Sequence, residues 1–191
     1  MKLVLASASP RRSLLLSTAG FVPDVRPANV IETLVDGEPA AESVLRLAEL
    51  KAKSVERAPS EVVLGADTMV VLDGIALGKP SDAADAVGML TALSARTHSV
   101  LTGWVVTGER GERFGVSESR VTFKELSDSA IADYVADAEP FDKAGAYALQ
   151  GENGRLIANV TGSRANVMGL PLRDIVEALE ALGIQRSTTH R

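Results

Sequence analysis

Cysteine is absent from this chain of 191 residues, and histidine is nearly so, with only His98 and His190 present. The first absence excludes disulfide bonds, thiolate nucleophiles and thiolate metal sites, and it suits a reducing compartment. The second leaves almost nothing from which to build a Ser/His/Asp triad or a histidine-rich zinc site. His98 adjoins a Val/Leu strand, which favours a structural role. The chemistry of this protein must therefore come from other oxygen and nitrogen groups.

Aromatic residues are scarce as well, at 4% of the chain against 46% for all hydrophobic residues. The core must then be built from valine, leucine, alanine and isoleucine, a composition that suits an α/β protein. The length favours one domain with a substantial core. We expect a single domain over residues 1–184, followed by a frayed tail at 185–191.

Long hydrophobic runs and an excess of positive charge are also missing. Every Val/Leu-rich run is interrupted before it reaches the length that spans a bilayer, and the run near the start is too short for a secretory signal. We therefore expect a cytoplasmic protein that does not bind membranes. The net charge of −5 argues against nucleic acid as a partner. A small anionic ligand stays compatible with this charge, because it needs only a few cations in one cleft.

Apolar periodicity and turn residues predict alternating strands and helices in the first half of the chain and strand hairpins later. We expect strands at 2–6, 21–26, 61–66, 69–72, 98–107 and 113–123, with short strands around 147 and 156. Helices are expected to begin near Pro10, Pro39, Ser81, Ser127 and Pro171, with Ser9 and Ser81 as N-caps. This order predicts an α/β fold in which helices cover both faces of a mixed sheet.

A candidate anion site lies where the first strand runs into the first helix. The Walker loop, the GxGxxG motif and the kinase Gly-rich loop are all absent, so phosphate would have to bind differently. This turn brings the hydroxyls of Ser7 and Ser9 and the guanidiniums of Arg11 and Arg12 close to the free N–H groups of a helix N-terminus. Arginine suits the task because its planar fork binds phosphate oxygens in pairs. Two surface arginines beside an ordinary cap are the alternative.

Asp67 is the sharpest signal of chemistry. It stands in the sequence Gly-Ala-Asp-Thr, between two apolar runs that read as strands. A carboxylate in the middle of a sheet is costly unless it meets a metal, a cation or several donors. The alternative is a strand-end aspartate that caps the following turn. Glu32, in a polar loop, would be unremarkable by itself.

Two further segments place cations among glycines. Lys79 follows a hairpin whose turn is predicted at Asp73-Gly74 and could return over the surface that carries Asp67, although a turn lysine in solvent is the alternative. Asp142 and Lys143 belong to the sequence Asp-Lys-Ala-Gly-Ala-Tyr, which combines both signs of charge with a glycine in an apolar context. That combination is typical of a site, and a local ion pair is the alternative.

The motifs form an ordered set along the chain. In order they are Ser-x-Ser-Pro-Arg-Arg, the loop glutamate, Ala-x-x-Lys-Ala at 48–52, Gly-Ala-Asp-Thr, Gly-Lys-Pro, Asp-Lys-Ala-Gly-x-Tyr, Gln150-Gly151 and Val-Met-Gly-Leu-Pro at 167–171. In this order they resemble the Maf family of nucleotide pyrophosphatases, and the resemblance covers essentially the whole chain.

This resemblance implies an elongated α/β fold with a long, twisted mixed sheet flanked by helices, two lobes and a central cleft, similar to that of the inosine-triphosphate pyrophosphatases. It also implies a homodimer and a metal-dependent hydrolysis of nucleoside triphosphates to the monophosphate and pyrophosphate. Glu32 and Asp67 would bind Mg²⁺ or Mn²⁺ or position water, since oxygen ligands suit hard cations. Arg11, Lys51, Lys79 and Lys143 would hold the phosphates, with Ser7, Ser9 and Asp142 as further substrate-binding residues.

Arg12, Thr68 and Gln150 match the family members that prefer uracil- and thymine-containing triphosphates. We therefore predict dTTP and UTP as substrates, with modified pyrimidine nucleotides also compatible. The Gln150 amide offers both a donor and an acceptor to a pyrimidine edge. Residues 161–166 lack the aromatic side chains often found in that segment of the family. Two alternatives stay open: a non-catalytic nucleotide-binding regulator linked to septum formation or cell division, and a nucleotidyltransferase.

Overall fold

A computed structural model describes residues 1–138, 140–149 and 155–187. The chain divides into two compact units. The first unit comprises Met1–Asp67, Thr102–Ser117 and Gly169–Arg191, and the second comprises Thr68–Leu101 and Glu118–Met168. No helix in the described ranges is long and apolar enough to cross a membrane.

Within these ranges, the strands form one mixed sheet in the order β2-β1-β3-β5-β6-β7, with β4 paired to β3. The strands are β1 (Lys2–Leu5), β2 (Asp24–Val25), β3 (Glu61–Leu72), β4 (Ile75–Leu77), β5 (Thr97–Gly108), β6 (Gly111–Phe123) and β7 (Ile157–Thr161). β1 pairs in parallel with both β2 and β3, whereas β3–β4 and β6–β7 are antiparallel. The predicted α/β class and mixed sheet are confirmed.

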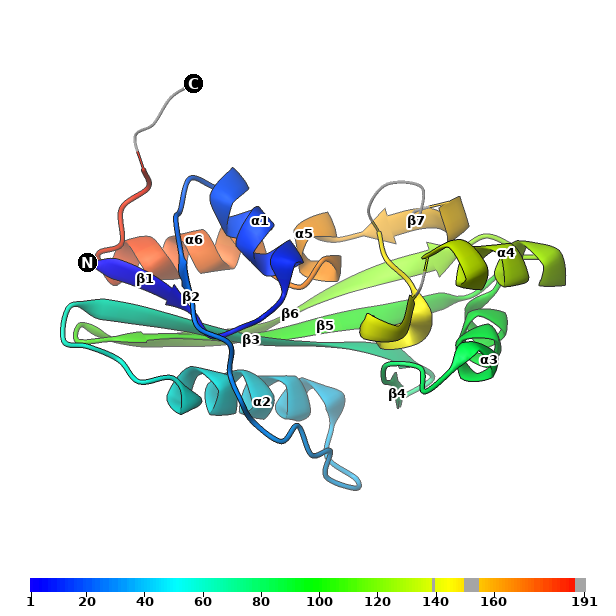
Figure 1. Cartoon of the computed structure of the whole chain (residues 1–191), viewed down its shortest axis with the longest axis horizontal. Coiled ribbons are helices and arrows are strands. Elements are labelled where there is room, and N and C mark those ends of the chain that lie inside the picture. The colour runs from blue at the N-terminus through cyan, green and yellow to red at the C-terminus, as the bar shows by residue number, and fades with distance from the viewer. Residues whose placement is uncertain (139, 150–154, 188–191) are drawn as a thin grey trace. The chain divides into compact units, whose positions relative to one another are not determined.

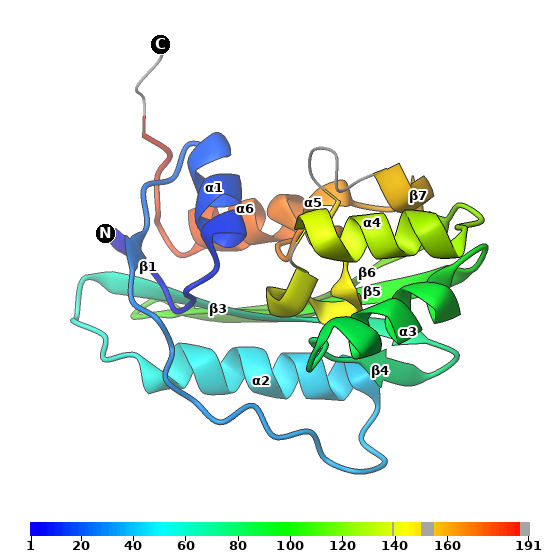
Figure 2. The same ribbon diagram turned by 45° about the vertical axis from the view of Figure 1, so that its right-hand side comes forward.

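Helices occur in both units. They are α1 (Pro10–Thr18), α2 (Ala40–Ser54), α3 (Ala83–Leu93), α4 (Asp128–Ala138), α5 (Arg164–Val167) and α6 (Leu172–Ala181), with the 3-10 turns η1 (Pro140–Asp142) and η2 (Ala144–Ala146). In the first unit, α2 lies on one face of the strands, and α1 and α6 lie on the other (Figures 1 and 2). The expectation of a sheet flanked by helices is therefore confirmed for this unit.

Glycines let α2 lie directly on the sheet of the first unit. A Cβ added to Gly65 on β3 would meet the backbone of Ala48, and one added to Gly103 on β5 would meet the backbone of Val44. The buried residues of α2 recur along one stripe, at positions 43, 44, 47, 48, 51 and 52. The helix backbone and the sheet are thus in contact along this stripe, and Lys51 is part of it.

The second unit has its own core, built on α3, α4, β7 and the 3-10 turns. His98 on β5 is a buried polar residue of this unit, and its Nε2 lies 2.7 Å from the Tyr147 hydroxyl. The rings of His98, Phe123 and Tyr147 meet edge to face, with centroids 4.9 to 5.3 Å apart. Burial lowers the pKa of His98 to about 4 and raises that of Tyr147. The structural interpretation of His98 agrees with these contacts.

We predict that the protein loses stability through His98 as the pH falls from 6.5 to about 4. The unfolded chain takes up the imidazole proton near its ordinary pKa, and the folded protein takes it up only at the lower one. The unfolded state therefore binds more protons than the folded state in this pH window. The free energy of unfolding should fall by on the order of 3 kcal/mol by the lower limit of the window. Urea unfolding between pH 7 and pH 4 measures the loss. His98→Gln keeps a polar partner for Tyr147 and should flatten this dependence; an unchanged dependence in the variant would contradict the assignment.

Two predicted strand boundaries are wrong. The strand expected at 21–26 is reduced to Asp24–Val25, because the prolines on either side of it cannot donate to a ladder. The break expected at Asp67-Thr68 does not occur, since β3 continues from Glu61 to Leu72. The predicted turn at Asp73-Gly74 is confirmed, because both residues have positive φ, 51° and 83°, as a type I′ hairpin requires.

Two local predictions further along the chain are also wrong. Helix α3 is capped by Asp82 and not by Ser81, because the Asp82 side chain accepts a hydrogen bond of 2.9 Å from the Asp85 N–H. The strand expected around Tyr147 is replaced by η2, in which Gly145 and Ala146 have φ values of 68° and 59°. Positive φ is incompatible with an extended strand.

Candidate functional site

Lys51 lies between two carboxylates in the first unit. Its Nζ donates to Asp67 Oδ1 at 2.6 Å and lies 3.0 Å from Glu32 Oε1. The side chains of Lys51 and Asp67 are only 9% and 8% exposed, whereas that of Glu32 is 50% exposed. Three residues predicted from separate motifs of the sequence are therefore brought together by the fold.

The pairing of Asp67 with Lys51 follows from the alternation of side chains along β3. Residues two apart on a strand face the same side of the sheet, so Asp67 shares the face of Gly65, which touches α2. Lys51 lies on the stripe of α2 that packs against this face. A buried carboxylate and a buried ammonium each lose hydration, and their contact offsets part of that cost. The interpretation of Asp67 as a turn cap is wrong, because Asp67 lies inside a continuous strand.

We predict that Gly65→Ala disrupts this site by displacing α2. The added methyl would overlap the Ala48 carbonyl and lie 2.7 Å from the Ala52 nitrogen, so that α2 and its Lys51 must shift. Overpacking of this kind costs about 1–3 kcal/mol, and activity should fall with it. The matched control is Gly88→Ala on α3, where a Cβ meets nothing within 4 Å; alanine there should leave stability unchanged or raise it slightly. Equal urea midpoints for both variants would contradict the prediction.

Arg12 is buried beside the turn that follows β1. Its Nε donates to the Gly169 carbonyl at 2.9 Å, and its Nη1 donates to Ser7 Oγ at 3.2 Å. Burial lowers the pKa of the Arg12 guanidinium, while the charges of Asp67 and Glu32 act in the opposite direction. Arg12 therefore belongs to the same electrostatic environment as the two carboxylates.

The same turn carries the other residues of the predicted anion site. The Ser9 N–H donates to Ser7 Oγ at 3.2 Å. Ser9 holds the N-cap position of α1, with Pro10 in the first turn, and its side chain makes no capping hydrogen bond. The predicted position of the cap is therefore correct, and no side-chain hydrogen bond accompanies it. Arg11 follows on α1 and is partly exposed, and its charge acts to lower the Arg12 pKa.

The remaining predicted residues belong to the second unit. Lys79 is exposed, and the Gly78 carbonyl before it accepts a hydrogen bond of 2.9 Å from the Gly145 N–H. That bond joins the Gly-Lys-Pro turn to the segment of Asp142 and Lys143, whose side chains form an ion pair. Thr68 is half-buried on β3. Gln150 lies outside the described residues.

Glu32 and Asp67 are the two carboxylates that could hold a hard divalent cation. Glu32 and Asp67 both approach one positive centre, the Lys51 ammonium, and oxygen ligands suit Mg²⁺ and Mn²⁺. In the described part of the chain, no group of three or more His, Cys, Asp or Glu side chains could hold a metal. An ion here would take two protein ligands and complete its shell with phosphate oxygens and water, as Mg²⁺ commonly does.

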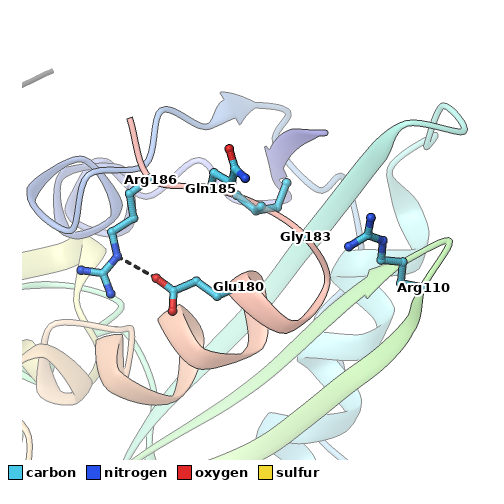
Figure 3. A pocket seen from close by; sticks show the side chains of 6 residues that line it. Arg110, Glu180, Gly183, Gln185 and Arg186 are labelled. Carbon is cyan, nitrogen blue, oxygen red and sulfur yellow. Dashed lines mark hydrogen bonds and ion pairs between the residues drawn. The ribbon is translucent and has the colours of Figure 1, made fainter. Parts of the chain in front are cut away.

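A separate pocket of about 590 Å³ lies at the end of α6 (Figure 3). There, Arg186 Nε donates to Glu180 at 2.9 Å. Its lining consists of Arg110, Glu180, Gly183, Ile184, Gln185 and Arg186. None of these residues belongs to the predicted site, so the pocket does not coincide with it.

Two contacts of the site were missed at the sequence level. The Gly169 carbonyl, which binds Arg12, lies 157 residues away in the chain, and no local pattern links the two. Arg46 on α2 donates to the carbonyl of Thr33, the neighbour of Glu32. From the sequence alone, Arg46 looks like an ordinary surface residue of the helix that carries Lys51. The sequence therefore held no signal for its contact with the loop.

The fold and site define an α/β protein in which a buried lysine joins two carboxylates beside a buried arginine. The family model described as "Maf-like protein" matches residues 2–182. The chain belongs to this family, as its ordered motifs predicted.

Two relatives of the chain share one name. The chain is 50% identical over 187 residues to a dTTP/UTP pyrophosphatase of Anaeromyxobacter sp. (strain Fw109-5), covering 95% of this chain and 90% of that protein. It is 48% identical over 185 residues to a dTTP/UTP pyrophosphatase of Citrifermentans bemidjiense, covering 95% of each. Among solved structures, a nucleoside-triphosphatase / dITP/XTP pyrophosphatase from Mycobacterium abscessus matches with a TM-score of 0.42 and 15% identity, over 95% of this chain and 94% of that one.

Proposed function

We propose that this protein hydrolyses nucleoside triphosphates, with dTTP and UTP among its substrates, to the monophosphate and pyrophosphate. The observation that carries the proposal is the contact of Lys51 with Asp67 and Glu32, in a chain 50% identical to a protein named for this activity. Binding an anion does not require carboxylates in its site. Their presence beside buried cations therefore supports hydrolysis over the regulatory alternative.

In the proposed reaction, a water molecule attacks the α-phosphorus, a new P–O bond forms, and the bond to the bridging oxygen breaks to release pyrophosphate. Asp67 would either accept the proton of the attacking water or serve as a ligand of the divalent cation. Lys51 binds phosphate oxygen and keeps the Asp67 and Glu32 carboxylates in place. A divalent cation, Mg²⁺ or Mn²⁺, held by Glu32 and Asp67 would neutralise phosphate charge when bound.

Further residues are proposed to bind the substrate. Arg11, Lys79 and Lys143 would hold the phosphates, and Ser7, Ser9, Thr68, Asp142 and Gln150 would make polar contacts with the nucleotide. Arg12 is proposed to help set the preference for pyrimidine bases. A homodimer and a cytoplasmic location stay predictions, and light scattering of the purified protein tests the first of them.

The experiment that tests the function incubates the protein with a panel of nucleoside triphosphates and Mg²⁺ or Mn²⁺. The products are separated into pyrophosphate and orthophosphate. We expect pyrophosphate in equal amount to the monophosphate, with dTTP and UTP turned over faster than the purine nucleotides. Orthophosphate release would indicate scission at a different bond, and binding without turnover of any nucleotide would support the regulatory alternative.

A further inference from the structure

Glu32 is held on a long loop, unlike Lys51 and Asp67, which stand on a helix and a strand. Residues 27–39, which follow the last N–H bonded to β1, that of Arg26, contain no helix or strand (Figure 1). Fixing such a segment costs conformational entropy at every residue. A few tethers must therefore determine whether the Glu32 carboxylate stays close to Lys51.

Arg46 supplies such a tether from α2, the helix that also carries Lys51. Its Nη2 donates to the Thr33 carbonyl at 3.1 Å, directly after Glu32. Its Nε and Nη2 donate to the two oxygens of Glu38 at 2.7 and 2.6 Å. Arg46 thus binds the loop both beside Glu32 and near the point where the loop enters α2.

The Glu38 carboxylate fixes the orientation of the Arg46 guanidinium. It also accepts a hydrogen bond of 2.5 Å from Ser43 Oγ. Hydrogen bonds, chiefly from Arg46 and secondly from Ser43, lower the pKa of Glu38 to about 2. The ion pair between Glu38 and Arg46 therefore persists at neutral pH. Lysine could not replace this arrangement, because one ammonium cannot bind two carboxylate oxygens and a carbonyl with the same planar geometry.

We infer that Arg46 is a positioning residue for the proposed hydrolysis: by binding the Thr33 carbonyl and the Glu38 carboxylate, it keeps Glu32 in contact with Lys51. Arg46 acts on the reaction through Glu32. The inference rests on the proposed function, because the effect of Arg46 is read from pyrophosphate release.

The test is a double-mutant cycle between Arg46 and Glu32. We expect Arg46→Ala to lower kcat by tenfold or more, up to about a hundredfold, with a smaller change in KM, because misplacement of a catalytic group by about 1 Å has effects of this size. In a Glu32→Gln background, the same substitution should cost less than about twofold, since its target is already lost. Glu38→Gln weakens the ion pair that orients the Arg46 guanidinium, so it should also lower kcat. If Arg46→Ala does not fold, Arg46→Lys takes its place in the cycle.

Arg26→Ala is the matched control. Like Arg46, Arg26 binds one carboxylate with two nitrogens: its Nη2 and Nη1 donate to the two oxygens of Glu61 at 2.6 and 2.8 Å. The Arg26 side chain is 33% exposed, against 36% for Arg46. It should lower stability and show no coupling to Glu32→Gln. If the fold-losses in kcat of Arg46→Ala and Glu32→Gln multiply in the double variant, the two residues act independently. That result would overturn the inference and leave the proposed function intact. Failure of the wild type to release pyrophosphate, or full activity of Glu32→Gln, would instead contradict the proposed function.

Discussion

Asp67→Asn is expected to lower pyrophosphate release by a hundredfold or more, on the order of one metal or general-base contribution. The asparagine keeps the size of the side chain and an oxygen that can accept from Lys51, so the packing between β3 and α2 should survive. What it removes is the negative charge and the ability to take a proton from water or to bind a hard cation. Steady-state release of pyrophosphate from dTTP measures the loss.

The control for this substitution lies on the same hairpin. Asp73 follows β3, is exposed, and forms a surface ion pair with Arg96. Asp73→Asn should leave activity within about twofold of the wild type, because exposed ion pairs contribute little and asparagine tolerates the positive φ of this position. If Asp67→Asn retained full turnover of every nucleotide, the proposed site would be wrong.

Elements with strong periodicity were the ones that the sequence could predict. The apolar stripe of α2 and the two long strands around the turn at 108–111 lie close to their predicted bounds. The segment 140–149 resisted prediction because its path depends on Gly145, which packs against Val70 with a positive φ and bonds to the Gly78 carbonyl. Such contacts are made by the folded core and leave no period in the sequence.

The candidate site was predictable only as a set of motifs. The sequence placed Asp67 between two predicted strands and Lys51 in a helix, but their pairing depends on Gly65, which lets that helix touch β3. Glu32 gave no signal of its own, since its position depends on side chains of α2. Arg12 was predicted to face a ligand, and the structure adds a bond to the distant Gly169 carbonyl. The chemical types of residue were therefore readable, whereas the contacts that orient them were not.

Lys51→Met is expected to damage stability and activity together. Methionine fills most of the volume of the lysine stem and removes the ammonium, which leaves the Asp67 carboxylate buried without its cation. Loss of one partner of a buried pair costs about 3–5 kcal/mol. The Glu32 carboxylate is half exposed, so water screens it and its share of the cost is small. Urea unfolding measures the change in the free energy of unfolding.

The two effects can be separated by a second substitution, because they have different causes. In Lys51→Met/Asp67→Asn the buried charge is removed along with its partner, so most of the lost stability should return. Activity should not return, since the cation proposed to hold phosphate and the carboxylate proposed to act on water are both gone. Recovery of turnover together with stability would mean that Lys51 and Asp67 only hold the fold. Continued instability of the double variant would contradict the assignment of the lost stability to an unpaired Asp67 carboxylate.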